Sequence, residues 1–184
     1  MDIMDAIRNR RSIRKYMPQP VEREKLDALI GAGFLAPSGS NAQNWFITVI
    51  TNEALLEKLG REGKDAVIRA ASPMYQKMAS AEGYKLIHGA PCFIIVSYDP
   101  LKPNGPIDAA LAIQNICLAA LSMGLGTCIN GLVNYLLNPE GMEGLREEFG
   151  IPAGMLCAAG ISVGYPDQSP QARPRDNTKA KYID

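Results

Sequence analysis

The 184-residue sequence predicts a single domain, 1–184, of mixed α and β class, because short strand-like apolar runs alternate with helical segments. Its hydrophobic content of 47% is ample for one packed core. Nineteen basic and nineteen acidic residues give a formal net charge of zero. The net charge of the chain therefore does not favour binding to nucleic acid or to a membrane surface.

Apolar residues that recur every three or four positions predict the helices, and β-branched or continuous apolar runs predict the strands. The expected helices span 2–9, 21–34, 53–60, 64–71, 107–123 and 139–149. The expected strands span 45–51, 92–98, 127–129 and 155–163. The alanine-rich helix 107–123 is apolar nearly all round, which places it at a domain centre or a subunit interface. Segment 72–89, with its proline, glycines, Met and Tyr, favours a mobile lid over a site.

The cysteines lie far apart in apolar stretches, which favours buried free thiols in a reducing compartment. They are Cys92, Cys117, Cys128 and Cys157. His88 is the only histidine and no CxxC occurs, so no metal site is expected. The first sixteen residues are charged without an apolar run, so we expect no export signal and a cytoplasmic location. Polar residues interrupt the apolar stretch 109–132, which favours a core helix and a turn over a membrane span.

Three familiar functional motifs give no support for a function here. Residues 160–164 match GxSxG, but a nucleophile elbow needs a following helix, and then an acid and a histidine later in the chain. Here Tyr165 and Pro166 follow, and the histidine lies upstream, so the match indicates a strand that turns on glycine. No GxGxxG follows a strand and no GxxxxGK[ST] occurs. Because these nucleotide-binding motifs are missing, NAD(P)H, if it is used, must bind transiently at a site built around another group.

Three polar segments carry donors suited to an anionic cofactor. In residues 10–14 the guanidiniums and the hydroxyl of Ser12 match the needs of a phosphate, although a solvated basic face is the ordinary alternative. In residues 37–45, hydroxyls, amides and a glycine suit the polar edge of a planar ring, or simply a turn. In the tail, Arg173 and Arg175 can share one face, or can belong to a disordered charged end.

In this order, the segments resemble the nitroreductase family of FMN-dependent oxidoreductases. The RRSxRx(Y/F) segment of that family corresponds to residues 10–16, and its PSxxNxQPW loop to residues 37–45. Its alanine-rich helix and glycine-rich turn correspond to residues 109–131. A GYP segment at 164–166 and an RPR element at 173–175 extend the resemblance over nearly the whole chain.

The resemblance implies an α+β fold with helices around a central, mainly antiparallel sheet, and a homodimer with FMN at the interface. The alanine-rich helix then becomes a dimer contact. The FMN-binding residues it implies are Arg10, Arg11, Ser12, Arg14, Pro37, Ser38, Gly39, Asn41, Gln43, Ile129, Asn130, Gly131, Arg173 and Arg175. Residues 37–41 would come from the other subunit, and residues 129–131 would line the ring, with a backbone N–H directed at flavin N5. Arg14 would lie near the pyrimidine edge, and the other arginines with Ser12 near the phosphate.

Two departures from the family pattern matter. Asn44 stands where the family has a proline, which we expect to loosen that loop. The tail after Arg175 lacks the usual hydrophobic closing segment, which puts the family's exchange of C-terminal segments between subunits in question.

The implied activity is hydride transfer from NAD(P)H through flavin N5 to a nitroaromatic, quinone, enone or similar small acceptor, in a ping-pong cycle. The flavin would carry the chemistry, so no side chain need act as acid or base. Two alternatives stay open. One is a flavin enzyme of different chemistry, such as flavin fragmentation or reductive dehalogenation. The other is a non-enzymatic domain with a basic arm that binds nucleic acid, which predicts salt-sensitive binding.

Overall fold

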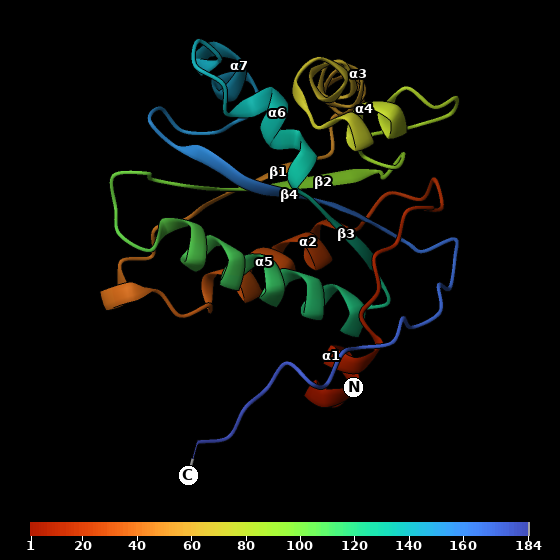
Figure 1. Cartoon of the computed structure of the whole chain (residues 1–184), viewed down its shortest axis with the longest axis vertical. Helices are drawn as coiled ribbons and strands as arrows, with labels where there is room; N and C mark the ends of the chain where they lie inside the picture. Colours follow the sequence, from red (N-terminus) through yellow and green to blue (C-terminus); the bar gives the residue numbers. More distant parts are fainter. Residues whose placement is uncertain (184) are drawn as a thin grey trace.

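The computed structural model describes residues 1–183 and has a four-stranded sheet at its centre, with helices on both faces (Figure 1). The strands are β1 (Phe46–Ile50), β2 (Cys92–Tyr98), β3 (Gly126–Asn130) and β4 (Leu156–Gly164), in the order β1-β2-β4-β3. All three strand pairs are antiparallel. The expected α+β class with a mainly antiparallel central sheet is therefore confirmed.

The helices form two layers (Figure 1). One face of the sheet is covered by α2 (Arg23–Phe34) and α5 (Gly105–Ser122). The other is covered by α3 (Glu53–Ala70), α4 (Pro73–Ala79), α6 (Asn134–Leu137) and α7 (Glu143–Glu148). The short α1 (Ile3–Asn9) contacts α5, and two 3-10 turns span Gly39–Asn41 and Gly131–Val133.

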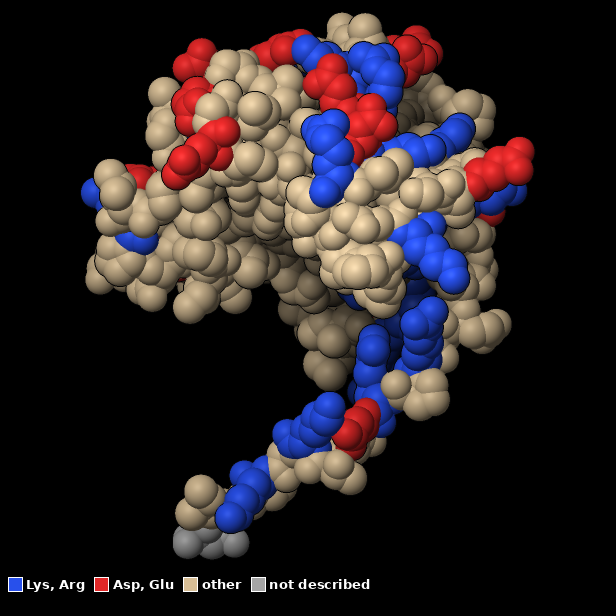
Figure 2. All heavy atoms as spheres, turned by 45° about the horizontal axis from the view of Figure 1, so that its top comes forward, with Lys and Arg blue, Asp and Glu red and all other residues tan. Residues whose placement is uncertain are grey.

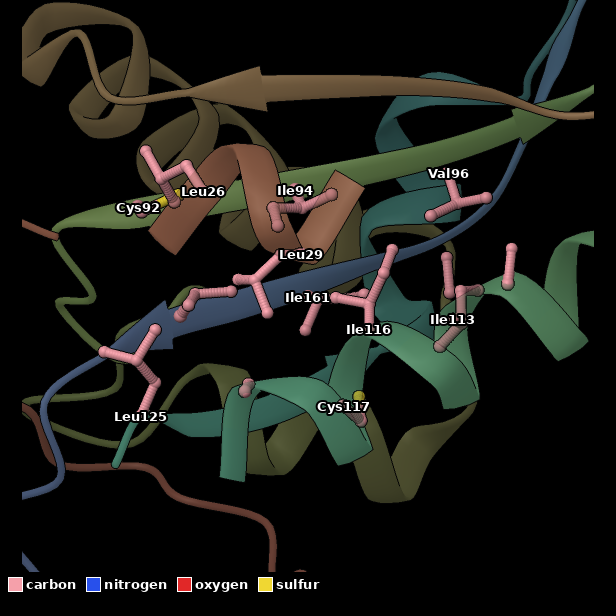
Figure 3. Packing of buried hydrophobic residues seen from close by; sticks show 14 of the residues in the cluster. Leu26, Leu29, Cys92, Ile94, Val96, Ile113, Ile116, Cys117, Leu125 and Ile161 are labelled. Carbon is pink, nitrogen blue, oxygen red and sulfur yellow. The ribbon is translucent and has the colours of Figure 1, made fainter. Parts of the chain in front are cut away.

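Strand β2 is buried on both faces, which explains why its sequence is a continuous apolar run rather than an alternating one. Ile94 and Val96 point toward α2 and α5, whereas Phe93 and Ile95 point toward α3 and α6. Leu29 of α2 and Ile116 of α5 pack against the first pair (Figure 3). Burying each such side chain contributes about 1.5–3 kcal/mol.

Helix α5 is long and apolar enough to cross a membrane by length and composition alone. However, 44% of it is buried inside the fold, where it packs on α2 and the sheet. Its opposite side carries exposed apolar residues, among them Ile107 and Leu111. The helix therefore has one side packed in the core and apolar side chains exposed on the other.

Two helix predictions were wrong. Residues 53–70 form one helix, because Gly63 does not interrupt α3 but lets Leu86 pack directly against it, where a Cβ would clash. Asn52 starts this helix by accepting a hydrogen bond from the N–H of Leu55 (3.0 Å). The helix expected over 139–149 begins only at Glu143, since Gly141 has a positive φ of 79°. Ser162, from the GxSxG match, is buried in β4 and donates to the carbonyl of Ile87 (3.0 Å), which confirms the strand interpretation.

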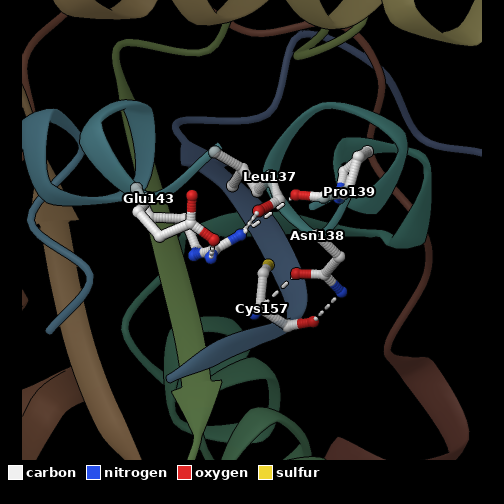
Figure 4. Close-up of polar contacts among 6 residues, drawn as sticks. Leu137, Asn138, Pro139, Glu143 and Cys157 are labelled. Atoms are coloured by element: carbon white, nitrogen blue, oxygen red, sulfur yellow. Dashed lines mark hydrogen bonds and ion pairs between the residues drawn. The ribbon is translucent and has the colours of Figure 1, made fainter. Parts of the chain in front are cut away.

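A buried arginine joins α6 to α7 (Figure 4). The Arg146 guanidinium donates to the carbonyl oxygens of Leu137 (2.8 Å) and Pro139 (3.4 Å) and pairs with Glu143 (2.8 Å). Carbonyls at the end of a helix have no partner within the helix, so this cation supplies the missing donors. Beside it, Asn138 exchanges two hydrogen bonds with the backbone of Cys157 on β4 (both 2.9 Å).

We expect Arg146→Met to lower the free energy of unfolding by about 2–4 kcal/mol, because it leaves buried carbonyl groups without donors. The control is Glu143→Gln, which removes an exposed charge and should cost less than about 1 kcal/mol. Urea denaturation of both variants tests the difference. Equal losses would show that the carbonyl contacts contribute little.

Candidate functional site

The basic segment, residues 10–16, runs in extended form along β3. Ser12 forms an isolated parallel bridge with Thr127, and the N–H of buried Ile13 donates to the carbonyl of Thr127 (2.9 Å). Gly126 permits this close approach, because a Cβ there would lie 2.7 Å from Cγ1 of Ile13. The pairing fixes the residues around Ser12 beside the strand that leads into Gly131.

Arg10, Ser12 and Arg14 lie near the buried thiol of Cys128 on β3. Burial raises the pKa of that thiol, and Arg14, Ser12 and Arg10 each act to lower it. His88 lies nearby as well, since its pKa is lowered first by burial and then by the charge of Arg14. Arg10 and Ser12, which are predicted to bind the phosphate, and Arg14, which is predicted to lie near the pyrimidine edge, are thus brought together along β3.

Arg11 has a different position from its neighbours. Its guanidinium donates to the carbonyls of Arg8 (2.7 Å) and Arg10 (2.8 Å) at the end of α1. A cation there satisfies terminal carbonyls and complements the helix dipole. The structure therefore gives Arg11 a capping contact, and its expected contribution near a phosphate stays a prediction.

The loop of residues 37–43 lies at the other end of α5. Within the described chain, three of its non-glycine residues have positive φ, namely Ser40 (52°), Asn41 (53°) and Gln43 (47°). Such backbone is costly outside glycine and persists only where the surroundings enforce it. Here Ser38 Oγ accepts from the N–H of Gln43 (2.9 Å), and a carboxylate on α5 accepts from the N–H of Gly39 (3.1 Å). Pro37 is exposed at the start of the loop.

That carboxylate belongs to Asp108, which the sequence reasoning missed. Asp108 is only 2% exposed, and its Oδ2 has no hydrogen-bond partner among residues 1–183. The available signal was its position as the one charged residue in the apolar run 107–123. It ties the loop to the first turns of α5, so we regard it as a positioning residue.

Asn44 fixes the end of this loop, so the expectation that it loosens the loop was wrong. Its buried amide donates to the carbonyl of Asp99 (3.4 Å) and accepts from the N–H of Asp99 (3.1 Å). A proline at this position could form neither bond. Two hydrogen bonds thereby replace the stiffness of a proline ring before the buried Trp45.

A cavity of about 810 Å³ opens beside β3. This volume lies within the usual range of about 300–1,000 Å³ for ligand pockets. Strand β3, the turn after it, the basic segment and α6 supply Arg14, Cys128, Ile129, Asn130, Gly131, Leu132 and Tyr135. Residues 75–88 supply Tyr75, Met78, Gly83, Tyr84, Lys85, Leu86 and His88. The segment expected as a lid is thus one wall of the cavity.

Asn130 ties that wall to β3. Its Nδ2 donates to the carbonyl of Leu86 (2.7 Å), and its Oδ1 accepts from the N–H of Leu132 (2.9 Å). Because the side chain is engaged with protein groups, contacts of residues 129–131 with a ligand would come mainly from backbone and from exposed Ile129 and Gly131.

The tail arginines do not join the basic segment within one chain. The tail starts beside it, where the N–H of Met17 donates to the carbonyl of Tyr165 (2.9 Å) and Lys15 pairs with Asp167 (2.6 Å). It then runs past α1 and projects from the body (Figure 1), with basic side chains along it (Figure 2). Arg173 and Arg175 are exposed, and residues 1–183 offer them no hydrogen bond or ion pair.

The basic segment and the loop lie at opposite ends of α5 (Figure 1). The loop is bonded to Asp108 near the start of the helix, and Ile13 is bonded to Thr127 just beyond its end. An 18-residue helix is about 27 Å long. Contacts from both segments to one planar ring would therefore require a second subunit.

The family model described as the Nitroreductase family matches residues 7–165. A protein of Methanothermobacter thermautotrophicus, provisionally named NADH dehydrogenase/NAD(P)H nitroreductase, is 33% identical over 177 residues, covering 94% of this chain and 82% of that protein. An FMN reductase (NADPH) of Bacillus subtilis is 28% identical, covering 97% of this chain and 72% of its own length. This chain belongs to the nitroreductase family.

Solved structures agree with the fold. A nitroreductase with bound FMN from Desulfitobacterium hafniense has a TM-score of 0.90 at 26% identity, and the match covers all of both chains. An FMN-dependent nitroreductase of Clostridium difficile has a TM-score of 0.83 at 30% identity, covering 99% of each chain. Iodotyrosine deiodinase has a TM-score of 0.80 at 20% identity over both complete chains, which shows a shared fold alone.

The four cysteines are free and buried, which confirms that expectation. Burial raises the pKa of every thiol, to about 12 for Cys92 and Cys157. Because the thiolate is the reactive form, we expect a thiol reagent to leave the native protein nearly unmodified near neutral pH and to modify all four thiols after denaturation. Rapid modification of the native protein would contradict this burial.

Proposed function

We propose that the protein is an FMN-dependent oxidoreductase that takes a hydride from NAD(P)H and reduces a small nitroaromatic, quinone or enone in a ping-pong cycle. One observation carries the proposal: the predicted flavin residues Arg14, Ile129, Asn130 and Gly131 line a single cavity of ligand size. Family membership supports it, as do the FMN that the similar structures bind and the flavin substrates that the relatives' names state. The whole chain would act as one FMN-binding domain in the cytoplasm, where free thiols persist.

The residues of the site fit FMN. Arg10 and Ser12 offer a guanidinium and a hydroxyl beside β3, which suit the dianionic phosphate. The tail leaves the body next to the same segment, so Arg173 and Arg175 would add two further guanidiniums on binding. The cavity that starts at Arg14 would hold the ring.

Bound FMN would supply hydride acceptance and donation at ring nitrogen N5. The chain would supply position and charge. Backbone of residues 129–131 would align the ring, and the charge of Arg14 would favour an anionic reduced ring. The wall of residues 75–88 would exclude water, and NAD(P)H would leave before the acceptor enters the same space.

We also propose a homodimer in which the loop of residues 37–43 reaches the partner's FMN. Exposed apolar side chains on α1 and α5 would be covered by that contact, namely Ile3, Met4, Ile7, Ile107 and Leu111. The separation of the loop from the basic segment along α5 supports a site shared between subunits. The polar groups of Ser38, Gly39, Asn41 and Gln43 would then complete the site from the other side.

Purified protein should show a flavin absorption spectrum, or acquire one with added FMN, and NAD(P)H should bleach it. We expect Arg10→Ala to weaken FMN binding about tenfold to a hundredfold, because it removes a charge-assisted contact to phosphate. The control is Arg69→Ala, which removes an exposed arginine from α3. Colourless protein that takes up no FMN would refute the proposal.

Mixing two variants with weakened sites tests whether the site is shared. As homodimers, Arg10→Ala and Asn41→Ala should each bind FMN more weakly than the wild-type protein at every site. A mixed dimer would have one site with both defects and one intact site, so random exchange should restore about a quarter of the sites. Titration of FMN into the exchanged mixture measures this. No recovery in proven mixed dimers would show that each site is built by one chain.

A further inference from the structure

The cavity beside β3 has a composition that binding of a flavin ring does not explain. Three tyrosines line it, namely Tyr75, Tyr84 and Tyr135, together with the basic groups of Arg14, Lys85 and His88. No aspartate or glutamate from residues 1–183 lines it. The formal charge of the chain is zero, so the positive charge of this cavity is a local feature.

The wall that carries these groups is held in place. The N–H of His88 donates to the carbonyl of Lys85 (3.0 Å), and the next carbonyl, of Leu86, accepts from Asn130 (2.7 Å). Gly89 has a positive φ of 67°, and the Lys85 side chain lies against it at ordinary contact distance, with its Nζ 3.8 Å from the position a Cβ would take. Lys85 is thus presented on a turn that is bonded to β3.

Of the basic groups, Lys85 is the one free to meet a substrate. Arg14 is assigned to the flavin edge, where its charge would be offset by the reduced ring. The pKa of His88 is lowered by burial and by Arg14, so the imidazole is mainly neutral at neutral pH. Lys85 has an exposed side chain and no ion pair among the described residues.

We propose that the site selects planar aromatic acceptors that carry a negative charge, such as nitroaromatic carboxylates, and that Lys85 is the specificity-determining residue. The inference rests on the proposed function, because the acceptor would lie between the flavin and the tyrosine-bearing wall. Tyrosine rings stack on planar aromatic groups, and a cation at the rim of a partly desolvated cavity attracts a carboxylate. Each turnover would consume one NAD(P)H and one proton, convert the nitro group to nitroso and release water.

The test compares 4-nitrobenzoate with 4-nitrobenzamide, which have nearly the same shape but differ in charge. We would measure kcat/KM with each acceptor for the FMN-loaded wild-type protein and for three variants, Lys85→Met, Lys85→Arg and Lys77→Met. Dissociation constants for the oxidised protein, from absorbance titration without NAD(P)H, would give a readout independent of turnover. Lys77 is the matched control, because it is an exposed lysine of α4 outside the cavity.

We compare each variant by two ratios, nitrobenzoate over nitrobenzamide, one for kcat/KM and one for affinity. We expect Lys85→Met to lower both ratios about threefold to tenfold. Lys85→Arg and Lys77→Met should leave both ratios unchanged. Raising the ionic strength from about 0.02 M to about 0.3 M should lower the wild-type ratio. A ratio unchanged by Lys85→Met and by salt would overturn the inference while the proposed function stands. Failure of NAD(P)H to bleach the bound flavin would instead refute the proposed function, and the inference with it.

Discussion

The burial of α5 against α2 and the sheet is the constraint on which the other features depend. Because one side of this helix is locked in the core, its two ends are fixed in space. The first turns hold the loop of residues 37–43 through Asp108, and the last turn leads into β3, which holds the basic segment. This helix therefore fixes how far apart the loop and the basic segment lie within one chain.

Much of this fold could be predicted from the sequence, because its strongest patterns arise from burial. The apolar run of β2 and the alanine-rich α5 are central elements, and their composition follows directly from that position. The errors occurred where a local signal has two meanings. Gly63 can end a helix or let a neighbour approach closely, and only the position of Leu86 distinguishes the two. The start of α7 depends likewise on the backbone at Gly141.

The candidate site was predictable in part for a similar reason. The functional groups of the basic segment belong to neighbouring residues in the chain, so the sequence alone was enough to identify it as a candidate site. Asp108 and Asn44 act through long-range hydrogen bonds, one for Asp108 and two for Asn44, to residues far away in the chain, which no local pattern encodes. The lysine and tyrosines of residues 75–88 line the cavity because Asn130 bonds that segment to β3, and the sequence of the segment alone does not predict this contact. The tail arginines have no partner in the described part of one chain, so the fold of a single chain does not explain why they are there.

The left-handed backbone at Ser40, Asn41 and Gln43 has an energetic consequence. Ordering a loop costs conformational entropy, and a flexible loop would incur that cost each time a ligand bound. Here the hydrogen bonds that Ser38 and Asp108 accept from the loop backbone, together with the neighbouring Asn44, impose the unusual conformation as the chain folds. The loop is therefore preorganised, and its polar groups can meet a ligand with little further loss of freedom.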